Sequence, residues 1–288
     1  MMYIVLTVIW LATYLVGTVL YEIYIVHMFQ QNSYKTREYM EWMQVHSNIG
    51  RLLGKCLYAL IAVPLVLIGN TGALVAACLT NLLTILVNKP HPAKKPLVYT
   101  MRVRRMLITT AVVYIVCVLA SFLAGAYAAR AGKCILLLLC ISQPFLILLV
   151  NWMNRPVEHG IDRHYINDAA RILRDMPDLK IIGVTGSYGK TSVKYFLSTL
   201  LSGQYNVLHT PGNYNTTLGV VRTVREQMKP FHEIFICEMG AREVGDIKEI
   251  CDLVHPGYGI ITSIGPQHLQ SFHTIENIID TKFELADA

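Results

Sequence analysis

The residues best suited to chemistry lie in one run of small and polar residues, Gly183–Ser192, which reads GVTGSYGKTS. The apolar segment before it, Leu179–Ile182, predicts a short buried strand, and Val193–Leu197 after it predicts the start of a helix. Small residues between a strand and a helix let backbone N–H groups surround a phosphate, and the helix dipole favours negative charge there. In this arrangement the amine of Lys190 reaches the terminal phosphates and the Thr191 hydroxyl ligates Mg²⁺. We therefore expect a nucleotide site formed by Thr185, Gly186, Ser187, Gly189, Lys190, Thr191 and Ser192.

Three later groups are expected at the same edge of the domain. Glu238 directly follows the strand-like run Glu233–Cys237, and a carboxylate at the carboxyl end of a parallel strand points into the ligand crevice. Beside a bound triphosphate it is a natural Mg²⁺ ligand. His268 follows the strand-like run Tyr258–Thr262, and Lys282 comes soon after it. The turn-rich loop Thr210–Gly219 contains Asn213 and Asn215, and either a plain turn or a binding loop fits its composition.

The sequence before residue 154 has a different character. Hydrophobic residues make up 53% of the 288-residue chain, an excess concentrated in this part. Five segments approach the length of about 20 residues that a membrane-spanning helix needs. They are Tyr3–Tyr21, Leu52–Ile68, Ala73–Val87, Leu107–Ala128 and Cys134–Trp152. Asn81 and Gln143 are expected to hydrogen-bond neighbouring helices.

The distribution of basic residues predicts the orientation of these helices. Ten Lys and Arg residues lie in or beside the first and third connections, whereas the opposite side has only Arg130 and Lys133. The positive-inside rule then places the N-terminus outside and everything after Asn154 in the cytoplasm. We expect a multi-pass inner-membrane protein in contact with membrane lipid. The net charge of +6 is explained by these flanking residues, so nucleic acid is not an expected partner.

After the nucleotide loop, apolar strand-like runs alternate with helical patterns such as Val244–Val254. This order predicts an α/β P-loop domain with a mostly parallel sheet, following an α-helical membrane domain of about five spans. The domains are expected at residues 1–153 and 180–288, with a polar connector over 154–179 that includes a helix over Tyr165–Leu173. The seven cysteines form no CxxC pair and indicate buried thiols rather than disulfides or metal ligands.

Five motifs in this order resemble the central ATP-binding domain of the Mur ligases. They are TGSYGKTS, GNYN, the EMG after a strand, the HL pair at His268 and the Lys-x-Glu at Lys282. The resemblance covers roughly Asn154 to Ala288 and is strongest to the branch that adds D-Ala-D-Ala. It implies an ATP-dependent amide ligase of peptidoglycan precursor synthesis, in which ATP converts a carboxylate of a UDP-muramoyl peptide into an acyl phosphate and an amine attacks it.

The resemblance also implies a role for each matching residue. Lys190 and Thr191 hold the phosphates and a first Mg²⁺, which Glu238 also ligates, and His268 ligates a second metal ion. Lys282 matches a lysine that CO₂ converts into an anionic carbamate, and it would then serve as a metal ligand. Asn213 and Asn215 match a loop that contacts the γ-phosphate and the substrate. Lys190, His268 and Lys282 are accordingly the expected catalytic residues.

This chain departs from the family pattern in several places. The strict Walker pattern has Gly where this chain has Val184, and the family usually has Asn where this chain has Ser263. A membrane segment replaces the usual UDP-recognition domain, and the ATP-binding domain is expected to be incomplete at its C-terminus, so these 288 residues alone are not expected to turn over. Cell-wall synthesis proteins are further possible partners of the membrane part. The alternatives are another amide ligase of the superfamily, of the poly-glutamate type, and a membrane nucleotide-binding regulator or transport ATPase.

Overall fold

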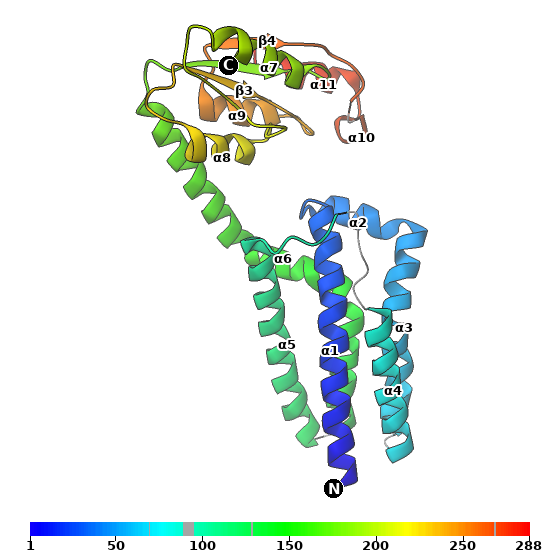
Figure 1. Cartoon of the computed structure of the whole chain (residues 1–288). Helices are drawn as coiled ribbons and strands as arrows, with labels where there is room; N and C mark the ends of the chain where they lie inside the picture. Colours follow the sequence, from blue (N-terminus) through cyan, green and yellow to red (C-terminus); the bar gives the residue numbers. More distant parts are fainter. Residues whose placement is uncertain (69, 89–94, 128, 268) are drawn as a thin grey trace. The chain divides into compact units, whose positions relative to one another are not determined.

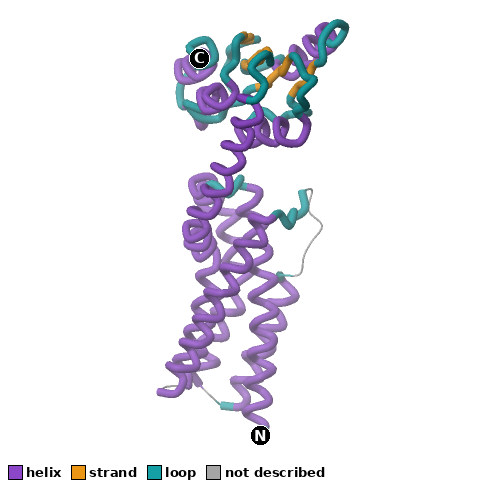
Figure 2. The backbone as a smooth tube through the Cα atoms, turned by 90° about the vertical axis from the view of Figure 1, so that its left-hand side faces the viewer, coloured by secondary structure: helices purple, strands orange, loops and turns teal. Residues whose placement is uncertain are grey.

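The computed structural model describes residues 1–68, 70–88, 95–127, 129–267 and 269–288. The chain divides into two compact units, Met1–Glu158 and His159–Ala288. The first consists of helices and the second contains every strand of the described residues (Figures 1 and 2). Each unit is described in turn.

The first unit is a group of helices that pack side by side (Figure 1). Within it, α1 contacts α4 and α5, and α3 contacts α2 and α4. The helices are α1 (Met2–Gln31), α2 (Thr36–Gln44), α3 (His46–Ile68), α4 (Thr71–Val87), α5 (Met101–Tyr127) and α6 (Ala129–Arg174). The predicted helix over Tyr165–Leu173 is the last part of α6, which continues without a break into the second unit.

The helices of this unit carry large apolar side chains on their outer surfaces. Val8 of α1, Leu119 of α5 and Leu138 of α6 are between 59% and 61% exposed. Among the described residues, three helical stretches are long and apolar enough to cross a membrane: Met2–Gln31, Met101–Ser121 and Cys134–Arg174. Thr71–Val87 is apolar but shorter. The described residues of all five predicted segments are helical, as predicted, whereas five complete spans remain a prediction.

Polar side chains inside this unit bond to neighbouring helices, as predicted for Asn81 and Gln143. Asn81 of α4 donates to the carbonyl of Trp10 in α1 at 3.1 Å. Gln143 of α6 donates to the carbonyl of Thr18, also in α1, at 3.1 Å. These bonds satisfy buried polar groups and fix the helices against one another.

The second unit contains a four-stranded parallel sheet in the order β2-β3-β1-β4. Its strands are β1 (Lys180–Thr185), β2 (Val207–His209), β3 (Ile234–Glu238) and β4 (Tyr258–Ile261). The register pairs Val184 with Glu238 and Thr185 with Ile261, so three strands end at the same edge of the sheet. The predicted strands correspond to β1, β3 and β4, whereas the three-residue β2 was not predicted.

Helices cover both faces of this sheet, because its strands carry apolar side chains on both sides. On one face, Val184 and Ile236 pack against Val193 and Leu197 of α7 (Lys190–Leu201). On the other face, Ile181 and Phe235 pack against apolar residues of further helices (Figure 1). These are the last part of α6, α8 (Thr217–Gln227), α9 (Asp246–Val254) and α11 (Ile275–Phe283), while α10 (Leu269–Phe272) adds Phe272. The mostly parallel α/β arrangement predicted for this part is confirmed.

Candidate active site

The glycine-rich loop begins where β1 ends at Thr185 and finishes where α7 begins at Lys190. Gly186 has a φ of +141°, and a Cβ there would collide with the Thr262 side chain. Gly189 has a φ of +80° and is the N-cap of α7. Both conformations disfavour residues with a side chain. Gly189, Thr191 and Ser192 are exposed, so the N-terminus of α7 is open to solvent, where anions bind readily.

Glu238, at the end of β3, is the centre of a hydrogen-bond network. Its carboxylate is 1% exposed and accepts from the Thr191 hydroxyl, which lies 3.1 Å from both carboxylate oxygens. Asn215 donates to Oε1 at 3.2 Å, and Lys194 donates to Oε2 at 2.8 Å. The structure thus brings together three predicted site residues, Thr191, Asn215 and Glu238, which are far apart in sequence.

The Asn215 side chain reaches Glu238 because of the glycine that follows β3. The N–H of Gly240 donates to the Asn215 carbonyl at 2.7 Å, and a Cβ on Gly240 would lie 2.7 Å from Asn215 Cγ. Only glycine permits this close approach. Asn213 lies in the same loop with an exposed side chain, and its carbonyl accepts from the Asn215 N–H at 2.8 Å.

The segment after β4 is bonded to the nucleotide loop. The N–H of Ser187 donates to the Ser263 carbonyl at 2.7 Å, and the N–H of Tyr188 donates to the Ser263 hydroxyl at 3.1 Å. The Ser187 hydroxyl donates to the Gly265 carbonyl at 3.0 Å. Ser263 therefore holds two of the loop's N–H groups through its own backbone and side chain.

Besides Lys194, two further lysines place positive charge near this edge. Lys190 donates to the Gly186 carbonyl at 2.5 Å, and burial lowers the pKa of its amine while the charge of Glu238 opposes that shift. Lys282 of α11 is 3% exposed, and burial together with the Lys190 charge lowers the pKa of its amine to about 8. Asp246 and Glu284 act in the opposite direction. At pH 7 an amine with this pKa is neutral in about a tenth of the molecules, a few hundred times more than for an ordinary lysine.

The oxygen atoms of Thr191 and Glu238 suit Mg²⁺, which prefers hard oxygen ligands and keeps several waters. Within the part of the chain that the structure describes, no group of three or more His, Cys, Asp and Glu side chains is arranged to hold a metal ion. A Mg²⁺ ion at this edge would therefore be held by one carboxylate and one hydroxyl, with water and phosphate oxygens completing its shell. This donor set fits the predicted first metal ion.

The other predicted residues have different outcomes. Thr185 is buried and donates to the Met239 carbonyl at 3.0 Å, so its hydroxyl supports the sheet edge. Ser192 is exposed in the first turn of α7. His268 lies outside the described residues, so its role as a metal ligand stays a prediction. Lys194 was not predicted, because a lysine in a helix usually lies in solvent.

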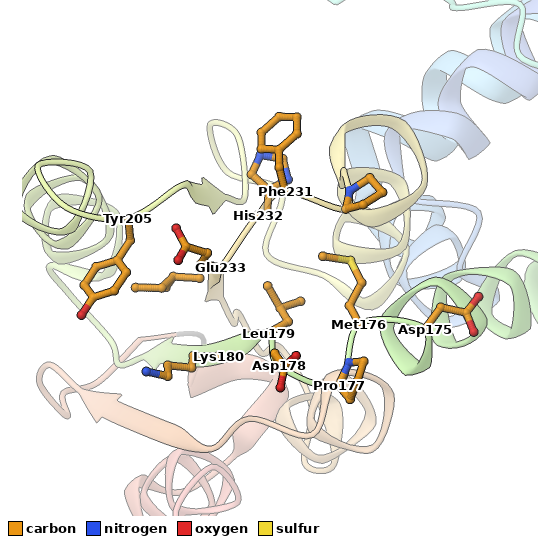
Figure 3. Close-up of a pocket in the computed structure, with 12 residues that line it drawn as sticks. Asp175, Met176, Pro177, Asp178, Leu179, Lys180, Tyr205, Phe231, His232 and Glu233 are labelled. Atoms are coloured by element: carbon orange, nitrogen blue, oxygen red, sulfur yellow. The ribbon is translucent and has the colours of Figure 1, made fainter.

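A cavity of about 430 Å³ lies at the opposite edge of the sheet, at the amino ends of β1 and β3 (Figure 3). Lys180, Tyr205, Phe231, His232 and Glu233 are among its twelve described lining residues, none of which is a predicted site residue. We place the candidate active site at the carboxyl edge, because the nucleotide loop and Glu238 lie there.

A parallel sheet with a glycine-rich loop leading into a helix, and a buried carboxylate beside that loop, defines an α/β nucleotide-binding domain. Comparison with known proteins makes the assignment more specific. Residues 184–288 match the model of the Mur ligase middle domain.

Curated proteins similar to this chain include UDP-N-acetylmuramoyl-tripeptide--D-alanyl-D-alanine ligases. The Synechocystis sp. protein is 39% identical over 107 residues, which are 37% of this chain and 23% of that protein. The Bacillus subtilis protein is 39% identical over 106 residues, with the same two coverages of 37% and 23%. This chain thus spans about a quarter of the length of these relatives.

Among solved structures, the MurF ligase from Thermotoga maritima in complex with ADP is 35% identical, with a TM-score of 0.41. The match covers 43% of this chain and 29% of that one. A MurF from Acinetobacter baumannii is 32% identical with a TM-score of 0.42, over 44% of this chain and 28% of that one.

Proposed function

We propose that this protein is a membrane-anchored, ATP-dependent amide ligase of peptidoglycan precursor synthesis. Its substrates would be a UDP-muramoyl peptide, which supplies the carboxylate, and D-Ala-D-Ala or a similar amine. The observation that carries the proposal is the contact of Thr191, Asn215 and Glu238 beside the nucleotide loop. The match of residues 184–288 to the Mur ligase middle domain and the similarity of this chain to D-Ala-D-Ala ligases support the choice of substrates.

In this proposal each residue acts through its position. Lys190 and the N-terminus of α7 would bind and orient the phosphates, and Thr191 and Glu238 would hold Mg²⁺. Asn215, and Asn213 in the same loop, face the terminal phosphate and the substrate carboxylate. ATP and Mg²⁺, when bound, supply the phosphoryl group and neutralise its charge. Catalysis of this kind depends mainly on positioning and charge neutralisation.

We also propose that Lys282 acts as a carbamate. Its neutral amine attacks the carbon of CO₂, a C–N bond forms, and one proton leaves the nitrogen to solvent. The product is an anion in place of a cation, so the repulsion of Mg²⁺ is replaced by attraction. The lowered pKa of this amine favours the reaction, because only the neutral form is nucleophilic.

The first unit would anchor the ligase in the inner membrane through about five spans, with the N-terminus outside and the nucleotide domain in the cytoplasm. The positive-inside distribution of Lys and Arg supports this orientation. ATP and UDP-linked precursors are then found on the side where the nucleotide loop lies.

The proposal is tested in the cell that makes this protein. Because these 288 residues alone are not expected to turn over, the substitution is made in the chromosomal gene, which keeps any further residues of the protein. Lys190→Met should then prevent phosphate binding and cause the UDP-N-acetylmuramoyl-tripeptide to accumulate, as measured by mass spectrometry of the soluble nucleotide pool. Lys248→Met, the same change in an exposed ion pair of α9, should leave that pool unchanged. An unchanged pool in the Lys190→Met strain would contradict the ligase role.

A further inference from the structure

Lys194 is a buried lysine in the immediate neighbourhood of the candidate active site. It lies one helical turn after Lys190 on α7, and its side chain is 0% exposed. Lysine is almost never fully buried unless its ammonium is paired with a charged or polar group. Its burial therefore indicates a specific partner, and the partners identify a role.

The Lys194 ammonium connects two parts of the site. It donates to Oε2 of Glu238 at 2.8 Å and to the Gly212 carbonyl at 2.6 Å. Glu238 ends β3, whereas Gly212 belongs to the loop that carries Asn213 and Asn215. One side chain of α7 thus fixes both the carboxylate and the loop relative to the nucleotide loop.

The bond from Lys194 also determines which carboxylate oxygen of Glu238 is available to a metal ion. Lys194 bonds to Oε2, whereas Asn215 bonds to Oε1 from the other side. Thr191, the second proposed Mg²⁺ ligand, lies 3.1 Å from both oxygens. Because the ammonium of Lys194 holds Oε2, Oε1 is the oxygen that can bind a metal ion in place of its neutral hydrogen-bond donors, Thr191 and Asn215.

We propose that Lys194 is a positioning residue that orients Glu238 for Mg²⁺ and holds the 210–215 loop beside it. The proposal rests on the proposed function, because it assumes that Glu238 binds the Mg²⁺ of a bound nucleotide. Lys194 acts through Glu238 and does not touch the nucleotide itself. A purely structural ion pair would support the fold but would leave the Mg²⁺ requirement unchanged.

The test measures binding of a fluorescent ATP analogue to the full 288-residue chain in detergent micelles, over a series of Mg²⁺ concentrations and in EDTA. Lys194→Met should raise the Mg²⁺ concentration for half-maximal binding about tenfold and leave binding in EDTA unchanged, because a lost hydrogen bond to a charged group is worth about a factor of ten or more. Lys248→Met, in the exposed pair with Asp252, is the matched control and should shift nothing.

A double-mutant cycle with Glu238→Gln separates positioning from a structural effect. In the Glu238→Gln background, Lys194→Met should change the Mg²⁺ midpoint less than twofold, because Lys194 has lost the group through which it acts. Lys194→Arg keeps a charged donor, so its Mg²⁺ midpoint should lie closer to that of the wild type than a tenfold shift. This variant allows the proposal to be decided even if Lys194→Met does not fold.

An unchanged midpoint in Lys194→Met, or equal shifts in both backgrounds, would overturn the role of Lys194 while leaving the proposed function intact. If the wild-type chain bound the analogue equally well with and without Mg²⁺, both the proposed function and this inference would be overturned.

Discussion

Lys282 allows a quantitative prediction about the stability of the second unit, because its environment disfavours its charged form. Burial and the Lys190 charge lower the pKa of this amine from its ordinary 10.5 to about 8. At about 1.4 kcal/mol per pKa unit, this difference corresponds to about 3 kcal/mol. The unfolded chain binds the proton more tightly than the folded chain, so this free energy opposes folding at neutral pH. Lys282→Met removes the charge but keeps a side chain of similar length, and we expect it to stabilise the second unit by about this amount at pH 7.

The expected gain depends on pH in a defined direction. Between pH 8 and 10.5 the unfolded chain holds a proton that the folded chain has released, so wild-type stability rises with pH over this window. The Met variant has no such titration. Its advantage is therefore fully present below pH 8 and should be lost as the pH approaches 10.5.

Hydrogen exchange of the full chain, followed by mass spectrometry over β1 (Lys180–Thr185), measures this effect. A gain of about 3 kcal/mol predicts exchange roughly 100-fold slower in Lys282→Met at pH 7. Lys248→Met, in an exposed ion pair, should change the exchange rate little. Faster exchange in the Met variant at pH 7 would refute the reasoning, because Lys282 would then be stabilised by its surroundings.

Three further predictions concern Lys282, Gly240 and the membrane orientation. With ¹³C-labelled CO₂ at pH 8, the wild-type chain should show a carbamate ¹³C resonance that Lys282→Met lacks; an identical spectrum would contradict carbamylation. In Gly240→Ala the new Cβ would lie 2.7 Å from Asn215 Cγ and should push Asn215 away from Glu238. We expect this change to weaken Mg²⁺-dependent ATP binding about tenfold in a fluorescence titration. Gly257→Ala is the control, since a Cβ there has no described atom within 4 Å, and equal affinities for the two variants would refute the steric argument. Protease added to inverted membrane vesicles should remove the residues after Asn154, whereas right-side-out vesicles should protect them; the opposite pattern would reverse the proposed orientation.

The part of the site that could be predicted from sequence depends on local signals. A buried strand, a glycine-rich run and a helix start follow one another around Gly186 and Lys190, so loop and helix N-terminus could be placed together. Glu238 could be placed because a carboxylate directly follows an apolar strand, and parallel strands end at one edge. Thr191 and Glu238 do lie in contact.

The residues that were missed depend on long-range contacts. The burial of Lys194 results from partners 18 and 44 positions away, Gly212 and Glu238, and a helical pattern contains no sign of them. The strand β2 (Val207–His209) has three residues, too few for an alternating pattern. The helix over Tyr165–Leu173 was predicted separately because a polar stretch precedes it, yet α6 is continuous through Pro156.

The central claim is that Thr191 and Glu238 form a Mg²⁺ site on the nucleotide loop. Calorimetric titration of ATP into the full chain, with and without Mg²⁺, tests it most directly when wild type, Glu238→Gln and Glu226→Gln are compared. Glu226 forms an exposed ion pair with Arg222 on α8 and is the matched control. The account predicts that Mg²⁺ tightens ATP binding at least tenfold in wild type and Glu226→Gln and by a clearly smaller factor in Glu238→Gln, with similar affinities in EDTA for all three. Full tightening by Mg²⁺ in Glu238→Gln would contradict it.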